Sequence, residues 1–256
     1  MSERRLISTA EGTHSGSFGP SEWGLLAFAG VTWGASFLFI AEALEAFTPA
    51  QIGFLRVALA FIALSFLRSA RSVPVERADW PRIVVLGVLW MALPFILFPL
   101  AEQRVSSSLA GMLNGAVPLF AAAIAAILLR RLPGSKQMIG LLIGLVGLLL
   151  IGLPAFTAGT SSIVGVVLVL SAMACYGLSI NLTVPVTQKY GALPVIWRSQ
   201  FVAVVLSAPG ALFGIRSTQF DASSFAAILA LGIGGTALAY IAMSILAARV
   251  GGTRAS

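Results

Sequence analysis

The chain has little charge, one cysteine and one histidine. Charged residues make up 10% of its 256 residues, against about 25% in a typical soluble domain, and hydrophobic residues make up 58%. Cys175 alone cannot form an internal disulfide, and His14 alone cannot form a histidine relay or a zinc site. Walker, Gly-x-Ser-x-Gly and metal-ligand motifs are absent from the sequence. We therefore expect neither an enzyme nor a bound cofactor or metal.

Long uncharged segments predict an all-α polytopic membrane protein. A helix of about 20 apolar residues crosses the hydrocarbon core of a bilayer and satisfies its backbone hydrogen bonds without water. Eight segments of the sequence fit this requirement. We expect spanning helices near residues 23–43, 50–67, 83–101, 105–129, 137–153, 163–184, 193–214 and 223–248.

The basic residues lie in alternate gaps between these segments. Gaps on one side hold 12 of the 16 Lys and Arg residues, and gaps on the other side hold 2. Short cytoplasmic loops retain basic residues, so we expect a multi-pass protein of the cell (inner) membrane with a cytoplasmic N-terminus. These loops account for the net charge of +7, and no nucleic-acid partner is expected. Residues 1–22, polar and rich in Ser and Gly, are expected to be a disordered cytoplasmic tail.

An internal repeat relates two parts of the chain. Residues 86–105 align without a gap with residues 231–250, and seven of the twenty positions are identical. The offset of about 145 residues contains five helices, an odd number, so the second copy crosses the membrane in the opposite orientation. With one loop residue allowed, Arg56 falls opposite Gln200.

The repeat also predicts how the chain is organised. A first repeat of five helices occupies 23–153, an external loop 154–162, and an incomplete second repeat of three helices 163–256. In this register Val250 would begin a ninth helix, as Val105 begins the fourth. We therefore expect the second repeat to be truncated, with eight spans present.

Three motifs carry a resemblance to a known family. They are Trp33-Gly34-Ala35-Ser36-Phe37 followed by Pro49 and Leu55-Arg56, then Asn114-Gly115-Ala116-Val117-Pro118-Leu119-Phe120, and the glycine-rich run 140–147. Together they resemble the EamA-type members of the drug/metabolite transporter superfamily over roughly residues 23–256. The resemblance implies an inverted repeat of five plus five helices. It also implies a central substrate cavity lined mainly by helices 1, 3, 4, 6, 8 and 9.

Two polar residues inside apolar segments are candidate substrate-binding residues. A charge within the membrane costs roughly 2.5–3.5 kcal/mol, so each such residue needs an explanation. Arg56 is either a functional residue, as an anion anchor or the partner of a gating carboxylate, or a structural one, as the ion-pair partner of a carboxylate at the outer helix ends or a side chain that extends to the headgroups. The carboxylates in reach of such a pair are Glu42, Glu45 and Glu102. Asn114 either binds substrate near Pro118 or makes an interhelical hydrogen bond.

Aromatic residues far from the helix ends complete the candidate site. Interfacial Trp and Tyr belong at span ends, so aromatic side chains within a span either face a cavity or pack in the core. The candidates are Trp33, Phe37, Trp90, Tyr176 and Tyr240. Gly140, Gly144 and Gly147 predict close helix packing, within the fold or between two copies in a homodimer.

The expected function is secondary transport. A transporter of this type would move small polar or amphipathic metabolites, such as amino acids, outward by alternating access, although this substrate class follows from the resemblance alone. The alternatives are a membrane channel or scaffold, or a non-functional fragment of such a transporter. No Asp or Glu lies in the middle of a span, which disfavours proton-coupled antiport of hydrophobic cations. The expected partners are the metabolite and the lipid bilayer.

Overall fold

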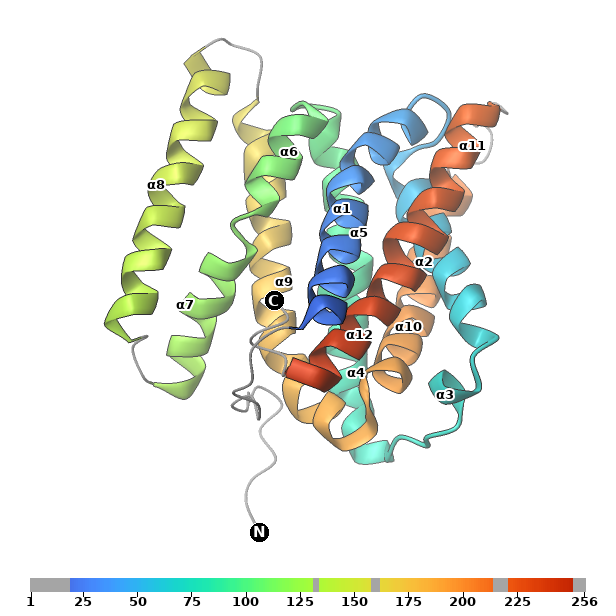
Figure 1. Ribbon diagram of the computed structural model, residues 1–256. Coiled ribbons are helices and arrows are strands. Elements are labelled where there is room, and N and C mark those ends of the chain that lie inside the picture. The colour runs from blue at the N-terminus through green and yellow to red at the C-terminus, as the bar shows by residue number, and fades with distance from the viewer. Residues whose placement is uncertain (1–18, 131–133, 158–161, 214–220, 251–256) are drawn as a thin grey trace.

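The computed structural model describes residues 19–130, 134–157, 162–213 and 221–250, in which every regular element is a helix (Figure 1). Six helical segments are long and apolar enough to cross a membrane, and two shorter apolar helices accompany them. The prediction of an all-α polytopic membrane protein is confirmed. The first half contains α1 (Pro20–Ala43), α2 (Pro49–Ser65), α3 (Arg68–Arg71), η1 (Arg77–Asp79), α4 (Trp80–Leu86), η2 (Gly87–Ala92), α5 (Leu93–Glu102), α6 (Ser107–Asn114), α7 (Val117–Leu129) and α8 (Ser135–Thr157).

The second half contains α9 (Ile163–Tyr190), α10 (Ala192–Phe213), α11 (Ala222–Leu229), η4 (Ala230–Leu238) and α12 (Ala239–Val250). Helices therefore occupy all eight predicted positions, with differences at their ends. α8 continues to Thr157, past the expected boundary at 153, with Pro154 in its last turn. α9 extends six residues beyond the expected 184, and Gly191, with φ of +80°, then turns the chain into α10.

Capping residues fix two helix starts. Thr48 and Gln51 form a capping box at α2, in which the backbone N–H of Thr48 donates to Oε1 of Gln51 at 2.9 Å, and Pro49 follows as the first helical residue. At α11 the carboxylate of Asp221 accepts from the backbone N–H of Ser224 at 2.7 Å. Both caps lie at the end of the bundle where α1 ends (Figure 1).

The predicted span over 105–129 consists of two helices. α6 ends at Asn114 and α7 begins at Val117, with Gly115 and Ala116 between them. Pro118 lies in the first turn of α7 and lacks the N–H that would bond back to α6, which is the physical reason for the break. The candidate residue Asn114 therefore lies beside a break within the membrane.

Two π-helical segments lie at positions related by the sequence repeat. η2 and η4 overlap when residue numbers are offset by 145, and each brings a glycine against a helix of the other half. A Cβ on Gly87 would lie 2.6 Å from Cβ of Val202 in α10. A Cβ on Gly232 would lie 2.6 Å from Cβ of Leu59 in α2. The third helix of one half thus meets the second helix of the other half at both places, a reciprocal arrangement that fits an inverted repeat.

α2 and α10 run in opposite directions and pack together within the bundle, whereas α8 lies at its edge beside α7 (Figure 1). The α2–α10 cluster consists of Val57, Ala60, Leu64, Met91, Phe95, Ile196, Ala203, Ala237 and Tyr240. Large apolar side chains of α8 stay exposed, as they do on a helix that faces lipid. No heavy atom lies within 4 Å of a Cβ placed on Gly140 or Gly147, so close packing of this glycine face stays a prediction.

Candidate functional site

Two chains of aromatic rings join the halves of the protein. Tyr240 of α12 makes edge-on contacts with Trp33 of α1, at 5.9 Å between centroids, and with Trp90 of η2, at 5.2 Å. Trp33 Nε1 also donates to the carbonyl of Gly235 at 3.1 Å. Edge-to-face geometry favours ordered rings, because the positive ring edge meets the negative face. Three of the aromatic residues that the sequence indicated therefore lie together.

The second chain involves Phe37, Phe98 and Tyr176. Phe98 of α5 lies 5.2 Å from the ring of Phe37 in α1 and 5.8 Å from that of Tyr176 in α9. Gly111 of α6 lies against Phe37, where an added Cβ would come within 3.2 Å of the ring. This chain therefore brings two more of the predicted residues together, and Phe98 is an addition to the predicted set.

Arg56 lies between the two aromatic chains. Its side chain is buried, its Nε donates to Oγ1 of Thr236 at 2.8 Å, and its guanidinium carbon stands 4.1 Å from the ring centre of Phe95. Tyr176 and Tyr240, one from each aromatic chain, both lie within electrostatic range of Arg56. The charge is thus oriented by one hydroxyl and one ring.

The expected structural ion pair of Arg56 is not formed within the described residues. Glu102, at the end of α5, interacts electrostatically with Arg56, yet no carboxylate oxygen lies within 4.0 Å of the guanidinium. Both carboxylate oxygens of Glu102 are inaccessible and lack a hydrogen-bond partner. Buried polar atoms without partners are uncommon, so this carboxylate belongs in the candidate site.

The sequence contains a pattern that predicts an inward orientation for Glu102, although this residue lies near a helix end. It follows Phe95 and Phe98 at intervals of seven and four residues, so the three side chains lie on one face of α5. Phe95 contacts Arg56, and Phe98 contacts Tyr176. Helical spacing from these aromatic residues therefore predicts that Glu102 points inward. Thr236, the partner of Arg56 across the repeat, has no such signal.

Asn114 is not part of either ring chain. Its Oδ1 is buried and lacks a hydrogen-bond partner at the end of α6, so the structure supplies no interhelical bond to this oxygen. Asn181 behaves differently, since its amide donates to the carbonyls of Gly177, at 2.8 Å, and Ala121, at 3.0 Å. Asn181 is thus a structural residue that ties α9 to α7, whereas Asn114 keeps an acceptor for another group.

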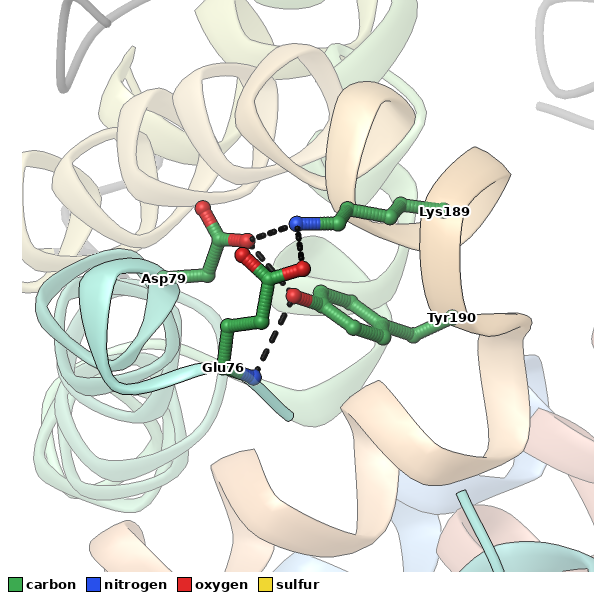
Figure 2. Close-up of polar contacts among 4 residues, drawn as sticks. All are labelled: Glu76, Asp79, Lys189 and Tyr190. Carbon is green, nitrogen blue, oxygen red and sulfur yellow. Dashed lines mark hydrogen bonds and ion pairs between the residues drawn. The ribbon is translucent and has the colours of Figure 1, made fainter. Parts of the chain in front are cut away.

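A polar cluster lies at one end of the bundle, near the point where α9 ends and α10 begins (Figure 2). Lys189 lies 2.8 Å from carboxylate oxygens of both Glu76 and Asp79. The hydroxyl of Tyr190 donates to Asp79 at 2.6 Å and accepts from the backbone N–H of Glu76 at 3.3 Å. These four residues, the Lys189 network, join the segment before α4 to the end of α9. Nearby, Arg198 donates to the carbonyl of Val73 at 2.6 Å.

A search of the described residues finds no group of three or more His, Cys, Asp or Glu that could hold a metal ion. The candidate site instead combines one buried cation, several aromatic side chains and a few buried oxygens that lack hydrogen-bond partners. Sites for small molecules have this composition, with mostly apolar walls and few polar groups.

Comparison with known proteins identifies the family. Residues 22–153, more than half of the chain, match the model of the EamA-like transporter family. The chain belongs to the EamA-like transporter family. This EamA-like chain is 27% identical over 231 residues to an uncharacterized transporter, YdfC, of Bacillus subtilis, covering 88% of this chain and 74% of the relative. It is also 23% identical over 222 residues to an uncharacterized transporter of Archaeoglobus fulgidus, covering 86% and 78%.

Membership in this family confirms the predicted resemblance and makes the protein a membrane transporter. The matched residues 22–153 include five of the seven predicted site residues: Trp33, Phe37, Arg56, Trp90 and Asn114. Tyr176 and Tyr240 come from the second half, and the ring contacts above connect them to the first. The candidate site is thus built by both halves of the chain.

Proposed function

We propose that this transporter binds a small metabolite with an anionic group at Arg56 and exports it, with amino acids as the substrate class. The observation that carries the proposal is a buried guanidinium without a carboxylate within ion-pair distance in the described chain. A buried charge needs a partner, and Nε alone has one, in Thr236. The remaining guanidinium nitrogens suit a carboxylate, which Arg binds through two parallel hydrogen bonds.

The residues around Arg56 define the rest of the proposed site. Trp33, Trp90 and Tyr240 provide an aromatic wall on one side, and Phe37 and Tyr176 provide one on the other. Such walls accept apolar parts of an amphipathic metabolite. Asn114, with its unpartnered oxygen, is assigned to a donor on the substrate at the break between α6 and α7.

Transport is proposed to follow alternating access between two repeat-related contacts. At the end of the bundle where α1 begins, Asp79 is held by Lys189. At the other end, Ser224, which is 145 residues beyond Asp79, donates to the carbonyl of Glu42 at 2.8 Å. We place the protein in the cell membrane. The positive-inside rule then orients it with the Lys189 network at the cytoplasmic end. One contact would open while the other stays closed.

The test is flux in proteoliposomes that contain the purified chain. A panel of radiolabelled amino acids and small carboxylates is offered, with uptake and counterflow measured for each. Arg56→Gln should lower flux of carboxylate substrates at least about tenfold, since a charge-assisted hydrogen bond contributes about 1.5–3 kcal/mol. The matched control, Arg68→Gln, changes an exposed arginine just beyond α2 and should keep the flux of the unchanged protein. Unchanged flux in Arg56→Gln contradicts the proposal, and flux without saturation or counterflow indicates a channel.

A further inference from the structure

Two neighbouring polar residues of α10 are fully buried, and their side chains lack hydrogen-bond partners. Ser199 and Gln200 have no exposed surface, and neither the serine hydroxyl nor either polar atom of the glutamine amide makes a hydrogen bond. A primary amide offers two donors and an acceptor, and buried groups of this kind are nearly always satisfied in proteins. These three polar atoms on adjacent residues lack hydrogen-bond partners, which points to a group that binds to them in another conformation of the protein.

Gln200 faces the region of Arg56. It lies four residues after Ile196 and three before Ala203, so the three share a helical face, and the other two pack in the α2–α10 cluster. That cluster includes Phe95, which contacts the guanidinium, and Tyr240, which contacts both tryptophans. The unpartnered amide of Gln200 and the buried guanidinium of Arg56 therefore border the same group of side chains.

The two residues lie at different depths in the membrane. Arg56 lies seven residues from the start of α2, or about 10 Å from the outer end, and Gln200 lies eight residues from the start of α10, or about 12 Å from the cytoplasmic end. Because the hydrocarbon core is about 30 Å thick, roughly 8 Å of depth separates them. This distance matches the length of a small metabolite with polar groups at both ends.

We infer that Gln200, with Ser199 behind it, is an inner polar subsite that binds a neutral hydrogen-bonding group of the substrate, a hydroxyl or an amide. The inference rests on the proposed function of Arg56, which binds the anionic end. In the present conformation the Lys189 network joins the segment before α4 to the end of α9, and Gln200 has no exposed surface. Release of the network exposes the subsite to substrate from the cytoplasm.

Cysteine accessibility tests the subsite. Gln200→Cys is made in a Cys175→Ala background and treated with a membrane-impermeant methanethiosulfonate in vesicles with the cytoplasmic face outward. The thiol should be unreactive with an intact Lys189 network and should react at least about tenfold faster when Lys189→Ala is added. A mixture of the nineteen amino acids other than cysteine, whose thiol would consume the reagent, should slow this reaction. Ala172→Cys, fully buried in α9, is the control and should stay unreactive throughout, which excludes general unfolding.

Two outcomes overturn the subsite. Failure of Gln200→Cys to react in the Lys189→Ala protein shows that this position does not open to the cytoplasm. Reaction that no amino acid slows shows an opening that binds no substrate. The proposed function fails separately, since it predicts loss of flux in Arg56→Gln whatever the labelling of position 200.

Substrate selectivity gives a second measurement. L-Glutamine and L-methionine are similar in length, and only glutamine ends in an amide, so Gln200→Leu should lower the ratio of glutamine to methionine flux about fivefold, the factor for one neutral hydrogen bond. Arg56→Gln should instead lower both fluxes together, because both substrates carry the carboxylate. An unchanged ratio in Gln200→Leu contradicts the assignment of Gln200.

Discussion

Arg56 and Thr236 are 180 residues apart in the sequence and 2.8 Å apart in the structure, from Nε to Oγ1. The same threonine hydroxyl donates to the carbonyl of Leu231 at 2.9 Å, five residues earlier. This spacing belongs to the π-helical turn η4, which leaves that carbonyl available. A widened helical turn in the second half thus orients the one buried cation of α2, which makes Thr236 a positioning residue.

Replacing Thr236 should separate positioning from packing. Thr236→Val keeps the shape and removes the hydroxyl, so we expect the KM for carboxylate substrates to rise about tenfold as the guanidinium loses its orientation. Thr236→Ser restores the hydroxyl and should recover most of this loss. Flux in proteoliposomes at equal protein amounts is the measurement. Equal KM values for the valine and serine variants would contradict a role in positioning.

The Lys189 network should contribute to stability in a manner that depends on salt. Lys189 and Asp79 are partly exposed, so solvent screens their ion pair and the pair stabilises the fold only weakly. A double-mutant cycle with Lys189→Ala and Asp79→Asn, measured by thermal unfolding in detergent, should give a small favourable coupling energy. The coupling should decrease at 1 M salt, where charges are screened within about 3 Å. Coupling that is zero at low salt would show that the pair does not hold this end of the bundle together.

The helices were predictable because span length and apolar composition follow directly from the properties of the bilayer. The break after Asn114 was indicated by Pro118, and the inward position of the aromatic residues by their distance from the helix ends. Thr236 was not predictable, because its role depends on a π-turn, and no sequence pattern marks such a turn. The amide of Gln200 lacks hydrogen-bond partners because of the side chains that face it from α2 and η2, and these can be identified only from the three-dimensional structure.

The reciprocal glycine contacts predict equal costs for two substitutions. Gly87→Ala and Gly232→Ala each place a Cβ 2.6 Å from a Cβ of the other half, so both should destabilise the fold by about 1–3 kcal/mol. Gly30→Ala is the control, since no heavy atom lies within 4 Å of its added Cβ. Melting temperatures in detergent provide the comparison. A cost at Gly87 without one at Gly232 would contradict the reciprocal arrangement.

The orientation of the bundle can be tested by labelling. From the basic-residue bias, a cysteine at Thr48 should react with an impermeant reagent added outside intact cells, and a cysteine at Ser72 should not. Thr48 directly precedes α2, and Ser72 follows the short helix α3 beyond the other end of α2, so the two positions serve as controls for each other. Reaction of position 72 from outside would reverse the proposed topology and place the Lys189 network at the outer end.

The carboxylate of Glu102 should destabilise the fold relative to the amide of a glutamine at the same position. Its two oxygens are buried without partners, and the nearby guanidinium of Arg56 lies beyond ion-pair distance. Glu102→Gln removes the charge and keeps the shape, so the melting temperature should stay equal or rise, because no hydrogen bond to the carboxylate is lost. Binding of a carboxylate substrate at Arg56 should tighten as the competing negative charge disappears. Glu45→Gln, at an exposed residue beyond α1, is the matched control and should change neither quantity. A clear fall in melting temperature for Glu102→Gln would show that Glu102 and Arg56 form a stabilising ion pair, and the anionic substrate would then have to displace it.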